Sequence, residues 1–235
     1  MINSVEILRP GIYSSVQDLR RIGYKKYGIP SSGPMDEYSH ILVNWVLGKN
    51  IFSETIEITF FGPKIKMNFA CNIAIYGSSC EAYLNQESIK PGVSIPVEEG
   101  DVIDIQKCID GNRVYLAFSA KMKIDSSFDS VSTYDKIEIG GVSGKKLSKG
   151  DIILFEKIKI IRKRKIPQIF NRRYDQSNII RIIEGFHFNR IENISDIENK
   201  AFKISNDSDR MAIRLSENKI KLHKKEEIES TVVNR

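Results

Sequence analysis

The segment SVQDLRRIGYKKYGIPSSGPMDEYSH, residues 15–40, starts like a strand and ends in the first turn of a predicted helix. Between these ends it contains three glycines, two prolines and the serine pair Ser31 and Ser32. A segment of this length without apolar periodicity inside a compact domain is usually either functional or disordered. The sequence on both sides of it, and its own motif, decide between these alternatives.

A helix is predicted from near Asp36 to Leu47. Either Asp36 or Ser32 can cap its first amides, and Gly48 is placed to end it. The residues at helical spacing that form its predicted apolar face are Ile41, Leu42, Trp45 and Val46. This is the one clear helical pattern in the chain.

Period-two patterns typical of half-buried strands dominate residues 55–120. In TIEITFFG, residues 55–62, one face carries Ile56, Ile58 and Phe60 and the other carries Glu57, Thr59 and Phe61. Further strands are predicted within residues 64–85, 100–106 and 111–120, separated by turns centred on glycine. We therefore expect a mainly β protein whose antiparallel strands form a meander or barrel.

Composition limits the class of protein. The chain has 235 residues, of which 41% are hydrophobic, enough for the core of one large or two small domains. Cys71, Cys80 and Cys108 form no CxxC pair and have no histidine at ligand spacing, so neither a zinc site nor a disulfide framework is indicated, and we interpret them as buried thiols in a reducing compartment. No run approaches the ~20 apolar residues of a membrane span, and the N-terminus has no leader pattern. A cytoplasmic protein is expected.

The densest positive charge of a chain with net charge +6 lies in KIKIIRKRK, residues 157–165. Its cations alternate with isoleucines and lead to Pro167, which is typical of a solvated strand running into a linker. No aromatic residues are interleaved with it, so nucleic acid is not an expected partner. We place the domain boundary in a linker between about Arg162 and Asn178. The predicted domains are residues 1–165 and 166–235.

Isolated motifs give no catalytic assignment. GGVSGKK, residues 140–146, lacks the glycine spacing and the final Ser or Thr of a phosphate-binding loop, so a turn is predicted. His40, His187 and His223 lie far apart, without a repeated spacing to a carboxylate or cysteine, and we interpret them as ordinary polar residues. No GxSxG elbow or other Ser-His-Asp set can be recognised.

Taken together, however, several motifs occur in a recognisable order. The opening segment matches the signature VQDxGRxGYxxxGxPxSGxMD, followed by an Asn and then GN, at Gln17, Asp18, Arg21, Gly23, Tyr24, Gly28, Pro30, Ser32, Gly33, Met35, Asp36, Asn44, Gly48 and Asn50. Later, IEITFFGP resembles LEITLxGP, RVYLAFSA resembles RxYLAxxGG, SVSTY resembles GSxSTY, and GGVSGKKLSKGD resembles GGxxGRxLxxGD. In the tail, IIRIIEGF and DRMAIRL resemble VRVxPGP and DRMGYRL. With these motifs the chain resembles the allophanate hydrolase subunit 2 family, also called carboxyltransferase subdomains A and B and, in bacteria, the C subunit of 5-oxoprolinase.

The resemblance implies a fold of cyclophilin-like β-barrel subdomains with one prominent helix, in a chain that forms half of a two-subunit unit. The implied function is that of a non-autonomous subunit of an ATP-dependent 5-oxoprolinase, with the B and A subunits as companions and with ATP bound through the complex. Because the same module occurs in urea carboxylase, a component of a biotin-dependent carboxyltransferase is the alternative. No self-contained set of nucleophile, base and orienter is recognised, so the chain alone is not expected to be active.

The resemblance also implies substrate-binding candidates around the opening segment. The turn at residues 30–33 would present backbone amides at a helix N-terminus to a carboxylate or phosphate. Gln17, Asp18 and Arg21 offer a planar donor–acceptor, a carboxylate and a guanidinium fork, either for a substrate or for a turn network that fixes the loop. The full set of candidates is Gln17, Asp18, Arg21, Ser32, Gly33, Asp36, Asn44, Glu57, Arg113, Ser132, Thr133 and Arg210.

The chain also departs from the family pattern. Arg20 stands where the family has Gly. The other replacements are Ser119-Ala120 for Gly-Gly, Phe128-Asp129 for Leu-Gly, Glu184 and Phe186 for prolines, and Ala212-Ile213 for Gly-Tyr. The sequence ends in EIESTVVNR where the family continues, so we expect an incomplete second barrel with poorly covered apolar residues at Ile180, Ile182, Phe202 and Ile204. A truncated, inactive remnant that keeps only partner binding is therefore a further alternative.

Overall fold

The computed structural model describes residues 2–156, 164–171, 179–180, 182–185, 187–210 and 212–223. Contacts between Cα atoms divide the chain into two compact units, Met1–Tyr174 and Asp175–Arg235. Most of the basic run at 157–165, much of the predicted linker, and Phe186 lie outside the described residues. The boundary between residues 165 and 166 stays a prediction.

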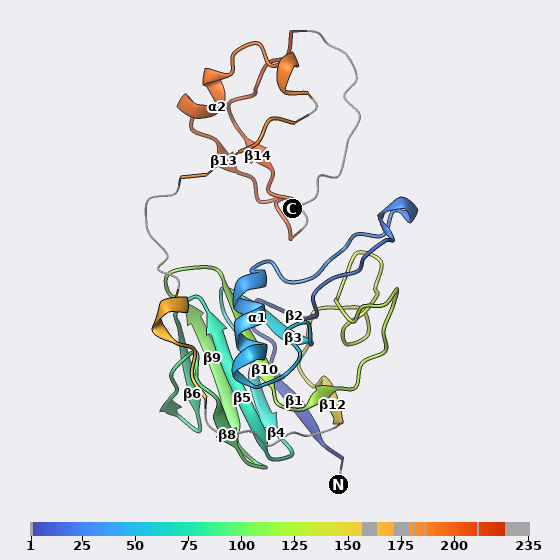
Figure 1. Ribbon diagram of the computed structural model, residues 1–235, viewed down its shortest axis with the longest axis vertical. Coiled ribbons are helices and arrows are strands. Elements are labelled where there is room, and N and C mark those ends of the chain that lie inside the picture. Colours follow the sequence, from blue (N-terminus) through green and yellow to red (C-terminus); the bar gives the residue numbers. More distant parts are fainter. Residues whose placement is uncertain are drawn as a thin grey trace. The chain divides into compact units, whose positions relative to one another are not determined.

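Two antiparallel sheets form the first unit (Figure 1). A seven-stranded sheet has the order β11-β12-β1-β4-β9-β6-β7, and a five-stranded sheet has the order β2-β3-β10-β5-β8. The strands of the larger sheet are β1 (Ser4–Arg9), β4 (Lys64–Met67), β6 (Cys80–Leu84), β7 (Glu87–Ser88), β9 (Val102–Cys108), β11 (Lys121–Met122) and β12 (Ile152–Glu156). Those of the smaller sheet are β2 (Tyr13–Gln17), β3 (Thr55–Thr59), β5 (Cys71–Gly77), β8 (Ile95–Val97) and β10 (Arg113–Phe118). The predicted mainly β fold class is confirmed.

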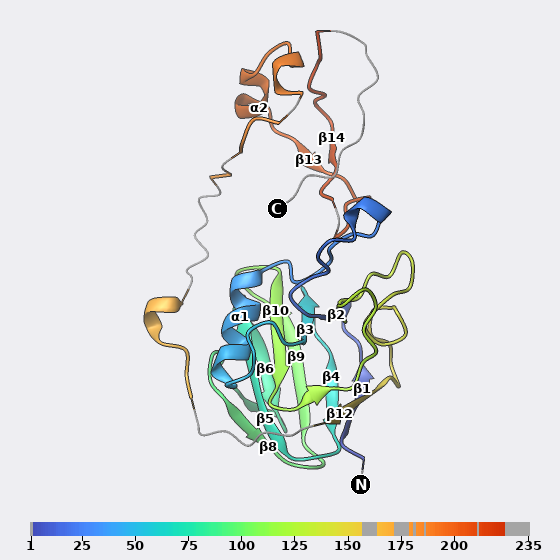
Figure 2. The same ribbon diagram turned by 45° about the vertical axis from the view of Figure 1, so that its right-hand side comes forward.

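The five-stranded sheet is covered on both faces, which makes three layers. Along β10, Val114, Leu116 and Phe118 pack in the core between the two sheets. Tyr115 and Ala117 point the other way, against helix α1 (Glu37–Val46). Figures 1 and 2 show this helix lying across the small sheet. Because neither face meets water, the β10 sequence RVYLAF is almost continuously apolar.

Helix α1 begins and ends where the sequence predicts. Asp36 is its N-cap, and the Asp36 carboxylate accepts hydrogen bonds from the Ser39 N–H at 3.2 Å and the Ser39 hydroxyl at 2.6 Å. After the helix, Gly48 takes a left-handed φ of 60° and its N–H donates to the Trp45 carbonyl at 2.9 Å. This conformation ends a helix at little steric cost only with glycine.

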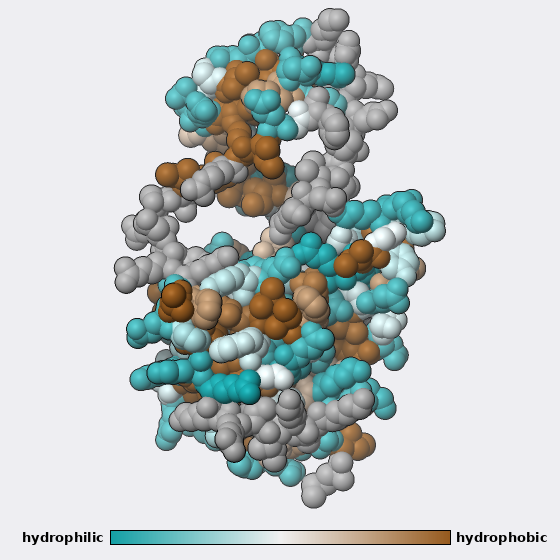
Figure 3. Space-filling model, viewed as in Figure 1, coloured by the Kyte–Doolittle hydropathy of each residue, from teal (hydrophilic) through white to brown (hydrophobic). Residues whose placement is uncertain are grey.

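Two apolar residues of the sequence patterns, Phe60 and Trp45, are not buried in the structure. Phe60 is 49% exposed, because β3 ends at Thr59 and Phe60 takes a left-handed φ of 59° that breaks the alternation. Trp45 is 42% exposed, because α1 turns Leu42, Val43, Val46 and Leu47 inward together with the polar His40 and Asn44. In Figure 3 hydrophobic side chains gather over and beside α1, with hydrophilic ones around them.

A long arm, residues 18–34, leaves the sheets between β2 and α1 and carries the short helix η1 (Lys25–Tyr27) near its tip (Figure 2). Beside it runs a second irregular segment, which we call the facing loop, residues 125–148. Within that loop GGVSGKK forms a turn, as predicted, with Val142 bridged to Lys145. The remaining short helix of this unit is η2 (Gln168–Phe170).

The second unit has little regular structure in its described residues. It contains η3 (Phe188–Arg190), α2 (Ser195–Asn199) and a small ladder of β13 (Lys203–Ile204) and β14 (Leu215–Ser216). None of its described residues is fully buried, and Ile180, Ile182 and Ile204 are 82%, 63% and 61% exposed, while Phe202 is half-buried. The incomplete second barrel remains a prediction. Among the described residues of the whole chain, none of the helices has the length and apolar character needed to span a membrane.

Removing the helix cap should destabilise the first unit. Asp36→Ala is expected to lower the free energy of unfolding by about 0.5–2 kcal/mol, because Ser39 loses its acceptor. Asp36→Asn keeps an acceptor oxygen and should retain most of that stability. Chemical denaturation followed by circular dichroism measures both. Equal stability of Asp36→Ala and the original chain would contradict the role of the cap.

Candidate functional site

The carboxylate of Asp18 joins the arm to the facing loop. Asp18 follows β2, and its carboxylate accepts hydrogen bonds from the hydroxyls of Ser130 and Ser132, both at 2.5 Å, and from the Val131 N–H at 2.8 Å. In return, the Asp18 N–H donates to the Ser132 hydroxyl at 3.1 Å. Three donors on one carboxylate form a strong, oriented link between segments that are distant in sequence.

Arg21 forms a second link between the same segments. Its side chain is only 2% exposed, and its Nε donates to the Ser127 carbonyl at 3.0 Å while Nη2 donates to the Ser132 carbonyl. Burial lowers the pKa of the guanidinium, and the Asp18 carboxylate partly opposes that shift. A Cβ at Gly140 would lie 2.8 Å from Arg21 Nη2 and 2.1 Å from the Ser132 carbonyl oxygen, so only glycine fits there.

Below the start of α1 lies the fully buried carboxylate of Glu57 on β3. Its Oε2 accepts hydrogen bonds from the Met35 N–H at 2.7 Å and from the Tyr115 hydroxyl at 2.8 Å. The Tyr115 oxygen in turn accepts from the Asp36 N–H at 2.7 Å. Arg113 Nε lies 3.8 Å from Glu57 Oε1. The backbone amides of Met35 and Asp36, at the start of α1, are therefore directed to groups of the chain itself.

A polar cluster continues from β2 into α1. The Gln17 side-chain amide donates to the Ser15 hydroxyl at 3.0 Å and to the Thr133 carbonyl at 3.3 Å. Thr133 is held beside β2, where its N–H and hydroxyl donate to the Val16 carbonyl at 2.9 and 3.0 Å. The structure thus brings together five of the candidate residues, Gln17, Asp18, Arg21, Ser132 and Thr133.

His40 is part of this buried cluster and was not recognised from the sequence. Its Nδ1 lies 3.0 Å from the Thr55 hydroxyl and its Nε2 lies 3.5 Å from the Asn44 side-chain nitrogen. Asn44 donates to the Ser53 carbonyl at 2.8 Å. Burial lowers the pKa of His40 to about 4, against the opposing effect of the Asp18 and Glu57 carboxylates. The imidazole is therefore neutral at pH 7.

Several polar atoms of the cluster remain unmatched among the described residues. They are Gln17 Oε1, Arg21 Nη1, Asn44 Oδ1 and Ser32 Oγ, each buried without a hydrogen-bond partner. Ser32 does not cap α1; it and Gly33 instead have left-handed φ angles of 53° and 85° in the arm. Buried polar groups are normally satisfied, so such atoms mark places where a water or a polar ligand group fits.

The cluster does not form a complete catalytic set. Ser130 and Ser132 donate to Asp18, whereas His40 contacts Thr55 and Asn44. Arg210 belongs to the second unit. Within the part of the chain that the structure describes, no three His, Cys, Asp or Glu side chains gather to hold a metal ion. The arrangement can orient two loops and bind polar groups.

Two departures from the family pattern are accommodated in this region. Arg20, in place of Gly, has no left-handed φ, and its side chain forms an ion pair with Glu37. Asp129, also in place of Gly, does have a left-handed φ of 58°, which Asp tolerates better than most residues. It accepts a hydrogen bond from the Tyr24 hydroxyl at 2.6 Å, a third connection between the arm and the facing loop.

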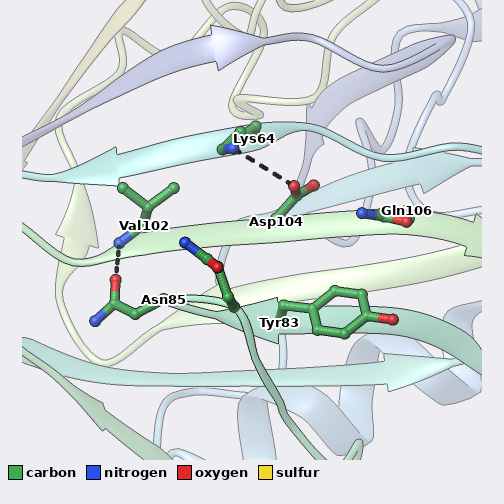
Figure 4. Close-up of a pocket in the computed structure, with 7 residues that line it drawn as sticks. Lys64, Tyr83, Asn85, Val102, Asp104 and Gln106 are labelled. Atoms are coloured by element: carbon green, nitrogen blue, oxygen red, sulfur yellow. Dashed lines mark hydrogen bonds and ion pairs between the residues drawn. The ribbon is translucent and has the colours of Figure 1, made fainter.

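A separate pocket of about 420 Å³ opens on the seven-stranded sheet (Figure 4). Its lining residues are Lys64, Tyr83, Asn85, Gln86, Val102, Asp104 and Gln106. Asp104 forms ion pairs with Lys64 at 3.7 Å and with Arg9 at 2.7 Å, and Asn85 accepts from the Val102 N–H at 2.9 Å. None of the residues predicted from the sequence lines this pocket, and its charged groups are already paired with each other.

Comparison with known proteins agrees with the motifs. The family model described as "Carboxyltransferase domain, subdomain A and B" matches residues 27–235. The urea amidolyase of Lachancea kluyveri is 38% identical over 149 residues, which are 63% of this chain and 8% of that protein. The C subunit of 5-oxoprolinase from Escherichia coli (strain K12) is 26% identical over 215 residues, which are 90% of this chain and 68% of that protein. The crystal structure of the K. lactis urea amidolyase matches 94% of this chain and 14% of its own with a TM-score of 0.77 and 29% identity.

The neighbouring arginines Arg20 and Arg21 provide a matched test of the loop link. Arg21→Lys should lower the free energy of unfolding by about 2 kcal/mol, because an ammonium cannot reproduce the fork that reaches two carbonyls. Arg20→Lys changes only a partly exposed ion pair and should cost less than about 1 kcal/mol. Urea denaturation compares the two. If Arg21→Lys lowers the free energy of unfolding no more than Arg20→Lys does, the proposed stabilising link between the arm and the facing loop through Arg21 is contradicted.

The buried His40 predicts a pH dependence. Its folded pKa of about 4 lies below the unfolded 6.5, so between these values the unfolded chain binds a proton that the folded chain does not. The stability provided by neutral His40 is complete above about pH 6.5 and is lost as the pH falls toward about 4. As the pH falls from about 6.5 to about 4, the free energy of unfolding of the original chain should decrease by about 2–3 kcal/mol more than that of His40→Gln.

Denaturation curves at several pH values measure that difference. His223 is exposed, and His223→Gln serves as the control for removal of a histidine. If the free energies of unfolding of His40→Gln and the original chain change equally with pH, His40 is protonated to the same extent in the folded and unfolded chain, which would contradict the prediction.

Proposed function

The chain belongs to the carboxyltransferase subdomain A and B family, and on that basis we propose that it is a non-autonomous subunit of an ATP-dependent 5-oxoprolinase. Such an enzyme opens the lactam of 5-oxo-L-proline to L-glutamate with hydrolysis of ATP. The observation that carries the proposal is the match with the C subunit of the E. coli 5-oxoprolinase, which includes 90% of this chain and 68% of that protein. That relative is named as a subunit of 5-oxoprolinase, and the match to this chain covers most of its length.

The geometry supports a role that depends on other chains. Asp18 and Glu57 place two carboxylates at the base of the arm, and each accepts hydrogen bonds from donors of its own chain. A carboxylate held in this way positions a loop well, but its oxygens are already committed to internal partners. The catalytic groups and the ATP site are then contributed by the companion A and B subunits.

The arm supplies the surface for these companions. Its Ile22 and Tyr27 side chains are 75% and 67% exposed, so they are accessible to a partner protein. The unmatched amide oxygen of Gln17 and nitrogen of Arg21 lie at the base of the arm. A lactam N–H and a carboxylate, the polar groups of 5-oxoproline, are complementary to an acceptor and a cationic donor.

A component of a biotin-dependent carboxyltransferase is the second candidate. It is favoured by the higher identity, 38%, to the L. kluyveri urea amidolyase. In that case biotin would belong to the partner proteins, and the same arm would face them. A chain that only binds a partner is the third possibility, and it predicts that the chain forms a complex with the A and B subunits in which no glutamate is produced.

Reconstitution with companion proteins tests the proposal. The purified chain alone should give no glutamate from 5-oxoproline, whereas its mixture with the A and B subunits should give glutamate formation that requires ATP and this chain. Turnover by the isolated chain, or by the A and B subunits without it, would refute the proposed role. Carboxylation activity with a biotin carrier and biotin carboxylase in place of these two subunits would support the second candidate instead.

A further inference from the structure

Two cysteines lie directly opposite each other on neighbouring strands. Cys80 starts β6, Cys108 ends β9, and the antiparallel register pairs them, next to a register shift between Cys80 and Ala82. The Cys108 N–H donates away from β6, to the Phe60 carbonyl at 2.7 Å, and the Ile109 N–H donates to the Ser79 carbonyl at 2.8 Å. The cysteines therefore occupy a position without hydrogen bonds between them, where facing Cα atoms are about 4.5 Å apart.

Their side chains also face the same way. Cys108 belongs to the core between the two sheets, and Cys80 packs against that same core. A Cα separation near 4.5 Å with side chains on one face lies within the range of about 4.4–6.8 Å that a disulfide spans. Cys71 differs, because its register partner on β8 is Val97. All three cysteines are free thiols in this structure.

We propose that Cys80 and Cys108 form a reversible cross-strand disulfide, a modification site that joins β6 to β9. Cys80 is the more exposed of the two, since Cys108 is only 7% exposed, so Cys80 reacts first. Its thiolate attacks a small-molecule disulfide such as oxidised glutathione, forming a mixed disulfide and releasing one glutathione thiolate. Cys108 then attacks the Cys80 sulfur, which forms the protein disulfide and releases the second glutathione. The two cysteine protons pass to the two released thiolates, so two protein thiols are oxidised and one small disulfide is reduced.

The location gives the link a structural consequence. In the order β9-β6-β7, the last two strands are held to the sheet only through β9. β6 and β9 also carry Tyr83 and Gln106, which line the pocket in Figure 4. A covalent bond between these strands fixes the edge of the sheet and two walls of that pocket.

The burial that brings the thiols together also slows their reaction. Burial raises the pKa of Cys80 to about 12 and raises that of Cys108. Because only the thiolate attacks a disulfide, the reaction is slow near neutral pH, and its rate should increase about tenfold for each unit by which the pH is raised toward the pKa of Cys80. The site therefore responds to sustained oxidation rather than to brief exposure.

Equilibration of the full chain with mixtures of reduced and oxidised glutathione tests the proposal. Peptide mapping without reductant should show Cys80 linked to Cys108, and the intact mass should fall by two hydrogen atoms. At a fixed concentration of reduced glutathione, the folded chain should reach half oxidation at a concentration of oxidised glutathione at least about 30-fold lower than the chain unfolded in urea, as a geometry-matched disulfide requires.

Two variants complete the test. Cys71→Ser should form the same link, and Cys108→Ser should stop at a glutathione adduct on Cys80. Linkage through Cys71, or equal oxidation of folded and unfolded chain, would overturn the proposal. The disulfide map and the comparison of folded with unfolded chain are both measured on the wild-type chain, so the conclusion does not depend on the folding of a variant.

Discussion

The buried carboxylate of Glu57 constrains how the first unit is assembled. A charge at a fully buried position is tolerated only when donors surround it, and here the donors come from the Met35 backbone and the Tyr115 hydroxyl. These contacts fix where the arm returns to the sheets and where α1 starts, shortly after Met35. The apolar face of α1 is thereby held over Tyr115 and Ala117. The three-layer order and the fixed base of the arm both follow from this one requirement.

Much of this architecture could be predicted because it depends on local periodicity. Alternation located Ile56 and Ile58 in the core, and the Asp36 and Gly48 signals bounded the helix. The errors have local physical causes that periodicity does not contain. The left-handed φ of Phe60 ends β3 at Thr59, and the buried face of α1 includes His40 and Asn44, which a hydropathy pattern assigns to solvent.

The contacts of the candidate residues could not be predicted from the sequence. Resemblance to a family pointed to Asp18 and Ser132, but their hydrogen bond joins positions 114 residues apart, which no motif spacing records. Tyr115 was missed, although a tyrosine pointing out of a doubly covered strand needs a partner for its hydroxyl. The alternatives left open for Gln17 and Asp18, substrate contact or turn network, are not exclusive, because the network is what holds the remaining polar atoms in place.

The links between the arm and the facing loop also order the events of folding. Asp18 and Ser130 are 112 residues apart and Arg21 and Ser127 are 106 apart, so the loop-closure entropy of these contacts is recovered only after the intervening strands have paired. We therefore expect docking of the arm to be a late step, so that the composite surface of arm and facing loop forms only when the strands between them have paired. A binding protein that recognises this surface consequently selects chains whose sheets are complete, and incomplete ones are left out of the assembly without any separate proofreading step.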